Sequence, residues 1–165
     1  MAIRKILKFP DQDLRIKAKP VETFDEELKA LTDDMFETMH SVNGIGLAAT
    51  QIGIAKRVAV IDISQEKNEP LVIINPVIQI LDPYKIEDYD EGCLSVPGFF
   101  ETISRPSDVK LSFQDLNGQK KEIKPEGLLT KVVQHELDHL NGRLFVDHIS
   151  ELKRRRIRNK IVKNK

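Results

Sequence analysis

The chain has 165 residues, of which 40% are hydrophobic and 32% charged, and this composition excludes a disordered protein. Its 26 basic and 26 acidic side chains give a formal net charge of zero, and no apolar run is long enough to span a membrane. The single cysteine, Cys93, excludes an internal disulfide and fits a reducing compartment. Because the start also lacks the apolar core of a signal peptide, we expect a cytoplasmic protein with no membrane partner.

The first predicted element is an amphipathic helix. Thr23 and Glu26 have the spacing of a capping box at its start, and Asn43-Gly44 is a typical end. Residues 44–51 are mostly small, so we expect a loop there that leads into a strand at residues 58–63. Apolar side chains recur along the helix at spacings of three and four: Phe24, Leu28, Leu31, Met35, Met39 and Val42.

Several short strands are predicted in the middle of the chain. β-branched runs cover residues 71–74 and 77–81, with Asn75-Pro76 between them, and residues 109–113 alternate as a half-buried strand does. Asn117-Gly118 predicts a hairpin turn before a strand at residues 120–123. Because these strands follow one another without intervening helices, we expect an α+β protein with antiparallel sheets.

The most informative stretch is His135-Glu136-Leu137-Asp138-His139. On a helix, residues i and i+4 lie about 40° apart, so both imidazoles can bind one metal ion while Glu136 reaches a water molecule on it. Leu128 and Val132 share the sector of the histidines. A buried helix with two structural histidines is the alternative interpretation. The arc predicted to lie outside the core and histidine sectors, including the solvent face, holds Thr130, Lys131, Gln134, Asp138 and Asn141.

A catalytic metal site usually has three protein ligands and an open position. Downstream, Phe145 occupies the place of a third histidine in the extended metalloprotease pattern, and Glu151 comes too soon for a ligand on a second helix. Asp147 and His148 are weaker candidates because they follow the end of the helix. A lone cysteine is more often an inert buried residue, but Cys93 lies among Gly, Ser and Pro, and a thiolate binds zinc or ferrous iron well.

Basic residues are concentrated at the C-terminal end. Eight basic and no acidic side chains follow residue 152, so the rest of the chain carries 18 basic and 26 acidic side chains. Such a tail is typical either of an arm that docks on RNA or of a solvated terminal helix. We therefore expect one domain, residues 1–165, with antiparallel sheets packed around a central metal-binding helix, an N-terminal helix, and a basic C-terminal helix at about 150–165.

Three segments together resemble the signature motifs of peptide deformylases, in the order of that family. They are GIGLAATQ at residues 44–51, EGCLS at 91–95 and QHELDH at 134–139. Leu14-Arg15 with Ala18, Pro20 and Val21 is similar to the family's N-terminal segment, so the resemblance covers essentially the whole chain. It implies a metal-dependent hydrolase of translation that removes the formyl group from the initiator methionine of nascent proteins and releases formate.

The resemblance also implies roles for individual residues. Glu136 would take a proton from water and pass it to the leaving amine, while the Gln51 side chain and the Leu94 backbone N–H would stabilise the oxyanion. Taken alone, Gln51 would be interpreted as a loop-end residue that caps backbone groups. The family implies ferrous iron, although the ligand set suits zinc as well and purified protein would carry zinc, nickel or cobalt. The ligands of this one divalent ion would be Cys93, His135 and His139.

Substrate contacts are predicted partly from the helix itself. Leu128 and Val132 should form an apolar wall beside the metal, joined by Ile45, and a methionine side chain fits such a pocket. Gly46 would let backbone approach the peptide, and Gly98-Phe99-Phe100 would line the route of the following residues. The alternative is that the three aliphatic side chains are ordinary core residues.

The partners follow from the same reasoning. We expect N-formylmethionyl peptides as substrates, ribosome contact through the basic helix, and a monomer. We also expect Glu91 and Arg105 to form an ion pair that braces the cysteine loop. Two other functions remain at this point: a different metal-dependent amidase or peptidase with the same ligands, and a non-catalytic, metal-stabilised module that docks on RNA.

Overall fold

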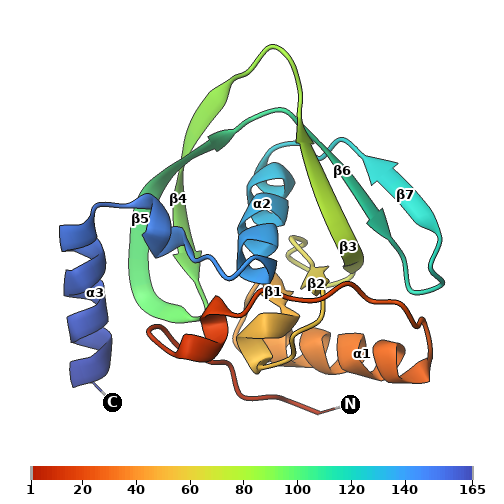
Figure 1. Ribbon diagram of the computed structural model, residues 1–165, viewed down its shortest axis with the longest axis horizontal. Helices are drawn as coiled ribbons and strands as arrows, with labels where there is room; N and C mark the ends of the chain where they lie inside the picture. Colours follow the sequence, from red (N-terminus) through yellow and green to blue (C-terminus); the bar gives the residue numbers. More distant parts are fainter. Residues whose placement is uncertain (1, 165) are drawn as a thin grey trace.

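The structure is a computed structural model that describes residues 2–164. Helix α2 (Leu128–Leu140) lies at its centre, between a two-stranded ribbon and a five-stranded sheet (Figure 1). The other helices are α1 (Glu26–Ser41) and α3 (Glu151–Lys163). The strands are β1 (Gly46–Ala48), β2 (Val58–Ile61), β3 (Leu71–Ile80), β4 (Ile86–Cys93), β5 (Val96–Pro106), β6 (Val109–Gln114) and β7 (Lys120–Ile123). The predicted α+β class with antiparallel sheets is confirmed.

Both sheets are antiparallel throughout. The larger has the strand order β1-β2-β3-β6-β7, and the smaller pairs β4 with β5. The two runs predicted as separate strands form one strand, β3, because the pairing with β6 only shifts register between Ile74 and Val77 and then continues. The expected hairpin turn at Asn117-Gly118 joins β6 to β7, with Gly118 at a φ of +80°.

Helix α1 begins one residue after Asp25, whose side chain accepts a hydrogen bond from the backbone N–H of Leu28. The predicted capping box at Thr23 and Glu26 was therefore wrong by two residues, since the better acceptor is the nearby aspartate. The predicted end is confirmed, because the helix stops at Ser41 and Asn43 adopts a φ of +56°. The apolar face of α1 packs on β1 and β2.

The segment predicted as a loop, residues 44–51, is largely regular structure. Gly46–Ala48 form strand β1 against β2, and Ala49–Ile52 form a short 3-10 helix. The ribbon β4–β5, which carries the cysteine motif, was not predicted at all. Its first strand is rich in acidic residues, which have a low strand propensity, so the pattern resembles a solvated loop.

Helix α2 is covered on more sides than its pattern predicted. Thr130, Lys131 and Gln134, assigned to the arc outside the core, are 1%, 5% and 8% exposed. The ribbon covers this side: the Lys131 ammonium binds Glu87 of β4, and the Gln134 amide donates to the Pro106 carbonyl of β5. A helix between two sheets has no fully solvated face, and its sequence alone does not reveal this.

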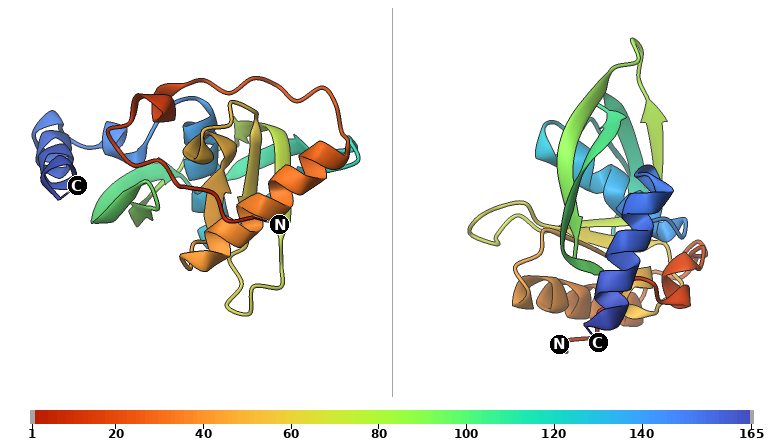
Figure 2. Two further views of the ribbon diagram at one scale, coloured as in Figure 1. Left: turned by 90° about the horizontal axis from the view of Figure 1, so that it is seen from below. Right: turned by 90° about the vertical axis from the view of Figure 1, so that its left-hand side faces the viewer.

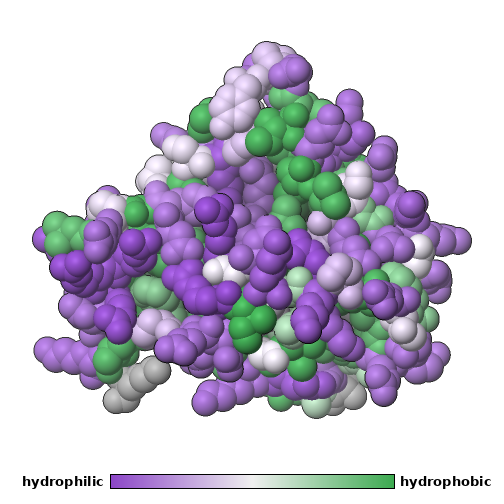
Figure 3. Space-filling model, in the orientation of Figure 1, coloured by the Kyte–Doolittle hydropathy of each residue, from purple (hydrophilic) through white to green (hydrophobic). Residues whose placement is uncertain are grey.

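Helix α3 lies at one end of the molecule beside the ribbon (Figures 1 and 2). Its Ile157 and Ile161 are buried with Val96 and Ile103 of β5, whereas its basic side chains are mostly exposed. The surface on the face shown in Figure 3 is mostly hydrophilic, with hydrophobic residues gathered near β3. Within residues 2–164, no helix has the length and apolar character needed to cross a membrane.

Candidate metal centre

Three potential metal ligands meet between the ribbon and the central helix. Cys93 ends β4, while His135 and His139 lie one turn apart on α2. The Cys93 Sγ is 3.2 Å from the His139 Nε2, and the two Nε2 atoms of His135 and His139 are 3.1 Å apart. The potential ligand atoms of the three residues all lie within 4.8 Å of one another.

This geometry fits a divalent metal ion. In a tetrahedral zinc site, the usual bond lengths imply ligand separations of about 3.3 Å between two nitrogens and about 3.6 Å between nitrogen and sulfur. The observed separations are slightly shorter, so a small opening of the site accommodates the ion. A thiolate with two imidazoles is also a ligand set that zinc and ferrous iron accept.

A buried carboxylate orients one of the ligands. The Glu91 Oε1 lies 2.9 Å from the His135 Nδ1, an arrangement that places the proton on Nδ1 and leaves Nε2 free for a metal. Arg105 binds both oxygens of Glu91, with Nη2 2.8 Å from Oε1 and Nε on Oε2. Burial would raise the pKa of Glu91, but these contacts with Arg105 and His135 lower it to about 2. The predicted ion pair of Glu91 and Arg105 is present.

The two weaker ligand candidates lie elsewhere. Asp147 accepts two hydrogen bonds from Arg15, at 2.6 and 3.0 Å. The His148 Nε2 is 2.9 Å from Asp138 Oδ2, which also accepts from Arg105 at 3.0 Å. Neither residue is therefore a metal ligand: Asp147 pairs with Arg15, and His148 pairs with the Asp138 that also accepts from Arg105.

Glu136 is a buried acid beside the first histidine. It is 2% exposed, and its Oε1 has no hydrogen-bond partner among the described residues. Burial raises the pKa of its carboxyl to about 7, close to the value that suits proton exchange near neutral pH. Its Oε2 lies so close to Gly46 that a Cβ there would come within 2.5 Å. A glycine at position 46 therefore makes room for this carboxylate, a role that the sequence did not indicate.

Gln51 and Leu94 are neighbours of the cysteine loop that also line the adjoining cavity. The Gln51 Oε1 accepts from the Ala48 N–H at 2.9 Å, which turns its amide nitrogen toward the cysteine loop. That nitrogen is 3.0 Å from the Ser95 Oγ and 3.6 Å from the Cys93 Sγ. Leu94 lies in the turn between β4 and β5 and packs among the side chains under α1.

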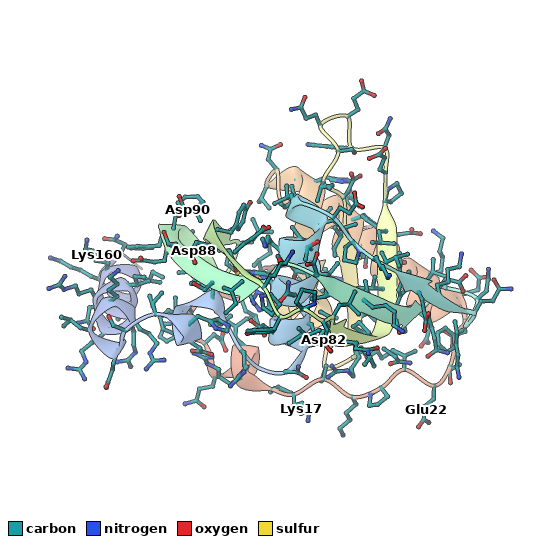
Figure 4. The ribbon with its side chains drawn as sticks, turned by 90° about the horizontal axis from the view of Figure 1, so that it is seen from above. Lys17, Glu22, Asp82, Asp88, Asp90 and Lys160 are labelled. Carbon is teal, nitrogen blue, oxygen red and sulfur yellow. The ribbon has the colours of Figure 1, made fainter. Side chains whose placement is uncertain are left out.

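A cavity of about 660 Å³ opens beside these groups. The ribbon and α2 form much of its wall; Figure 4 shows the side chains between them, with Asp88 and Asp90 marking β4. Leu128 is not among its lining residues and packs instead against the core of the large sheet. Of the predicted site residues, the lining includes Ile45, Gly46, Gln51, Cys93, Leu94, Gly98, Phe100, Val132, His135 and Glu136.

The cavity also has lining residues that the sequence did not indicate. Tyr89 comes from the unpredicted strand β4, and Lys131 from the side of α2 that its pattern placed outside the core. Val42, Pro97 and Lys8 complete other parts of the wall. None of these five belongs to the motifs, so no pattern in the sequence marks them as neighbours of a metal.

Comparisons with known proteins agree with one another. The model of the family described as polypeptide deformylase matches residues 3–155. The peptide deformylases of Cellvibrio japonicus and Azotobacter vinelandii are 56% and 55% identical over 163 residues, which are 99% of this chain and 96% of each relative.

Solved structures give the same result. A peptide deformylase from Legionella pneumophila superimposes with a TM-score of 0.92 and 51% identity, covering 98% of this chain and 95% of that one. The enzyme from Ehrlichia chaffeensis in complex with actinonin gives a TM-score of 0.94 and 40% identity, covering 100% and 99% of the two chains.

Proposed function

The chain belongs to the polypeptide deformylase family and removes the N-formyl group of nascent peptides, and we propose that the cluster of Cys93, His135 and His139 is the centre that does so. The observation that carries this assignment is the approach of one sulfur and two nitrogens from separate parts of the chain. The pocket beside them leaves space for a peptide. A divalent ion bound there supplies positive charge that activates water and polarises the formyl carbonyl.

Glu136 is the proposed proton carrier. Its carboxylate takes the proton of the attacking water and later gives it to the nitrogen that leaves as the free amine of methionine. In the metal-free protein burial raises the pKa of this carboxyl to about 7, and a cation bound beside it would favour the carboxylate that accepts the proton of water. Gly46 leaves room for the Glu136 Oε2, and the Oε1 has no hydrogen-bond partner among the described residues that would hold its proton.

The Gln51 amide and the Leu94 backbone N–H are the proposed donors to the oxyanion that forms on the formyl oxygen. Their support is position: both residues line the cavity beside Cys93, and the Gln51 amide nitrogen faces the cysteine loop. Donors fixed in advance by the fold stabilise developing charge without reorganising during the reaction.

The substrate is proposed to enter with its methionine side chain against Ile45 and Val132. Gly98 and Phe100 also line the cavity and would contact the residues that follow. The Phe100 side chain is 73% exposed, as expected for a contact with a peptide that leads out to solvent. Leu128 has no part in this proposal, since it does not line the cavity.

A formate-release assay tests the activity. A formyl-methionyl tripeptide should release formate, while its acetyl counterpart should be hydrolysed far more slowly. Glu136→Gln should retain the metal and lose turnover by roughly 10²–10⁴-fold, the usual contribution of general acid–base catalysis. Unchanged turnover in that variant would refute the assigned role.

Ferrous iron is the proposed physiological metal, with zinc, nickel or cobalt as replacements in purified protein. The ligand set supports a soft or borderline divalent ion but does not select among these. Elemental analysis of protein prepared without oxygen, compared with protein prepared in air, tests the proposal. Iron should dominate the first sample and decline in the second, and a first sample without iron would contradict it.

We also propose that the chain acts in the cytoplasm as a monomeric, single catalytic domain, residues 1–165, whose α3 contacts the ribosome. The buried Ile157 and Ile161 hold this helix to the body, and Arg156 and Lys160 are exposed on it. Deleting the helix would also expose the core beneath it, so Arg156→Gln with Lys160→Gln is the cleaner test. The double variant should bind ribosomes more weakly and keep tripeptide turnover; unchanged ribosome binding would refute the docking role.

A further inference from the structure

The cavity contains a buried cation that the reaction itself does not use. Lys131 of α2 is 5% exposed and lines the cavity beside Val132. Lysine is seldom fully buried without a partner, and here the ammonium group lies 3.0 Å from the Glu87 Oε2. That carboxylate side chain is 62% exposed, so water competes for it. The ammonium has three N–H donors. Glu87 takes one of them, which leaves the others for a second acceptor.

Two contacts fix where this lysine lies relative to the metal ligands. Lys131 and His135 are one helical turn apart, about 6 Å along the axis, and they bind Glu87 and Glu91 of β4 respectively. Side chains at alternate positions of a strand share one face, so Tyr89 lies between these two contacts and faces α2. Tyr89 also lines the cavity.

The opposite face of β4 is occupied differently. Asp88 and Asp90 accept hydrogen bonds from Ser104 and Thr102 across the ribbon, although Asp90 also borders the cavity. Burial, with Glu91 and Asp90 nearby, raises the pKa of the Tyr89 phenol, which therefore keeps its proton and remains a donor. Besides aliphatic side chains and carboxylates, the wall next to the metal centre thus holds an ammonium and a phenol that can donate hydrogen bonds.

Lys131 also marks the end of the cavity along the helix. The lining residues of α2 are Lys131, Val132, His135 and Glu136, and none precedes Lys131. A formyl group at the metal centre would place the methionine side chain along this same wall, with its sulfur and terminal methyl group at the end away from the reacting carbon. The sulfur of a methionine bound along this wall would therefore lie toward its polar end.

We propose that Lys131, assisted by Tyr89, lets the pocket accept methionine sulfoxide as well as methionine at the first residue of the substrate. Oxidation turns the thioether into a polar group whose oxygen accepts hydrogen bonds. In a wholly apolar pocket this oxygen would lose its water without a replacement donor. The ammonium supplies that donor, and the aliphatic stem of Lys131 still packs against an unoxidised side chain. This inference rests on the proposed deformylase site.

The test compares formyl-methionyl-alanyl-serine with its methionine sulfoxide form. The measured quantity is the ratio of their kcat/KM values in the wild type and in Lys131→Met, which has a similar length and no donor. The ratio should shift against the sulfoxide by roughly 10–100-fold in the variant, the effect of losing a hydrogen bond to a charged group. Calorimetric binding of the two deformylated products should show the same shift without turnover.

The matched control is Lys110→Met on β6, whose Nζ lies 3.8 Å from Glu122 on the neighbouring strand. It should leave the ratio at the wild-type value. If Lys131→Met fails to fold, Glu87→Gln serves instead: it frees the ammonium from its carboxylate and should shift the ratio toward the sulfoxide.

An unchanged ratio in the folded Lys131 variant, or in Glu87→Gln where that replaces it, would overturn the inference. A wild type that does not hydrolyse the unoxidised formyl peptide would instead overturn the proposed function. Product binding would still measure the contribution of Lys131 in that case, so the two failures are distinguishable.

Discussion

Replacing Glu136 by glutamine keeps the shape of the side chain and removes its charge. In the metal-free protein, burial raises the pKa of the Glu136 carboxyl from 4.5 to about 7. A raised pKa means that the folded protein holds the proton more tightly than the unfolded chain does. The resulting stabilisation is complete below pH 4.5 and is lost as the pH rises through about 7. The whole difference corresponds to roughly 3 kcal/mol of unfolding free energy.

Urea unfolding of metal-free wild type and Glu136→Gln at pH 5 and pH 8 measures this effect. From pH 5 to pH 8, the unfolding free energy of the variant should rise by about 2–3 kcal/mol relative to that of the wild type, since glutamine has no charge to bury. Bound metal should make this difference in unfolding free energy smaller, because positive charge nearby favours the carboxylate. If the two proteins change in parallel with pH, burial does not perturb this carboxyl and the reasoning fails.

Three other variants test the remaining contacts of the site. Gly46→Ala should lower kcat while the metal content stays constant, because its Cβ would lie 2.5 Å from the Glu136 Oε2; wild-type turnover would show that the carboxylate needs no such room. Gln51→Ala should raise the barrier by about 3–4 kcal/mol, seen as a loss of kcat, and should also lower the melting temperature because it leaves the buried Ala48 N–H without its acceptor. Arg105→Met should cost about 3–5 kcal/mol of unfolding free energy at pH 7, since it strands the buried Glu91 carboxylate. The wild-type contribution of Glu91 is present above pH 4.5 and lost as the pH falls toward 2, so equal stabilities at pH 7 would contradict the assigned pairing.

The local part of the metal centre could be predicted from the sequence. The spacing of His135 and His139 depends on helix geometry alone, and the helix forms where its pattern predicts. The place of Cys93 near His135 depends on the tertiary fold, because the two residues are 42 positions apart in the chain. Cys93 could be assigned as the third ligand only because the downstream candidates did not fit and because three motifs resemble those of one family.

The missing part of the prediction is the ribbon β4–β5. Its strand residues Asp88 and Asp90 have low strand propensity, but hydrogen bonds from Ser104 and Thr102 compensate across the pair. Without the ribbon, Lys131 belongs to a solvent-facing arc; with it, the lysine is buried beside the site. The error over Lys131 has a physical cause: the pattern of a helix shows its apolar side but not which neighbours cover the rest.

X-ray absorption at the metal edge tests the central claim most directly. The zinc-loaded protein should show one sulfur at about 2.3 Å and two histidine nitrogens at about 2.0–2.1 Å, and Cys93→Ala should lose the sulfur signal. A wild-type spectrum without sulfur in the first coordination sphere would contradict the account, whatever the protein hydrolyses.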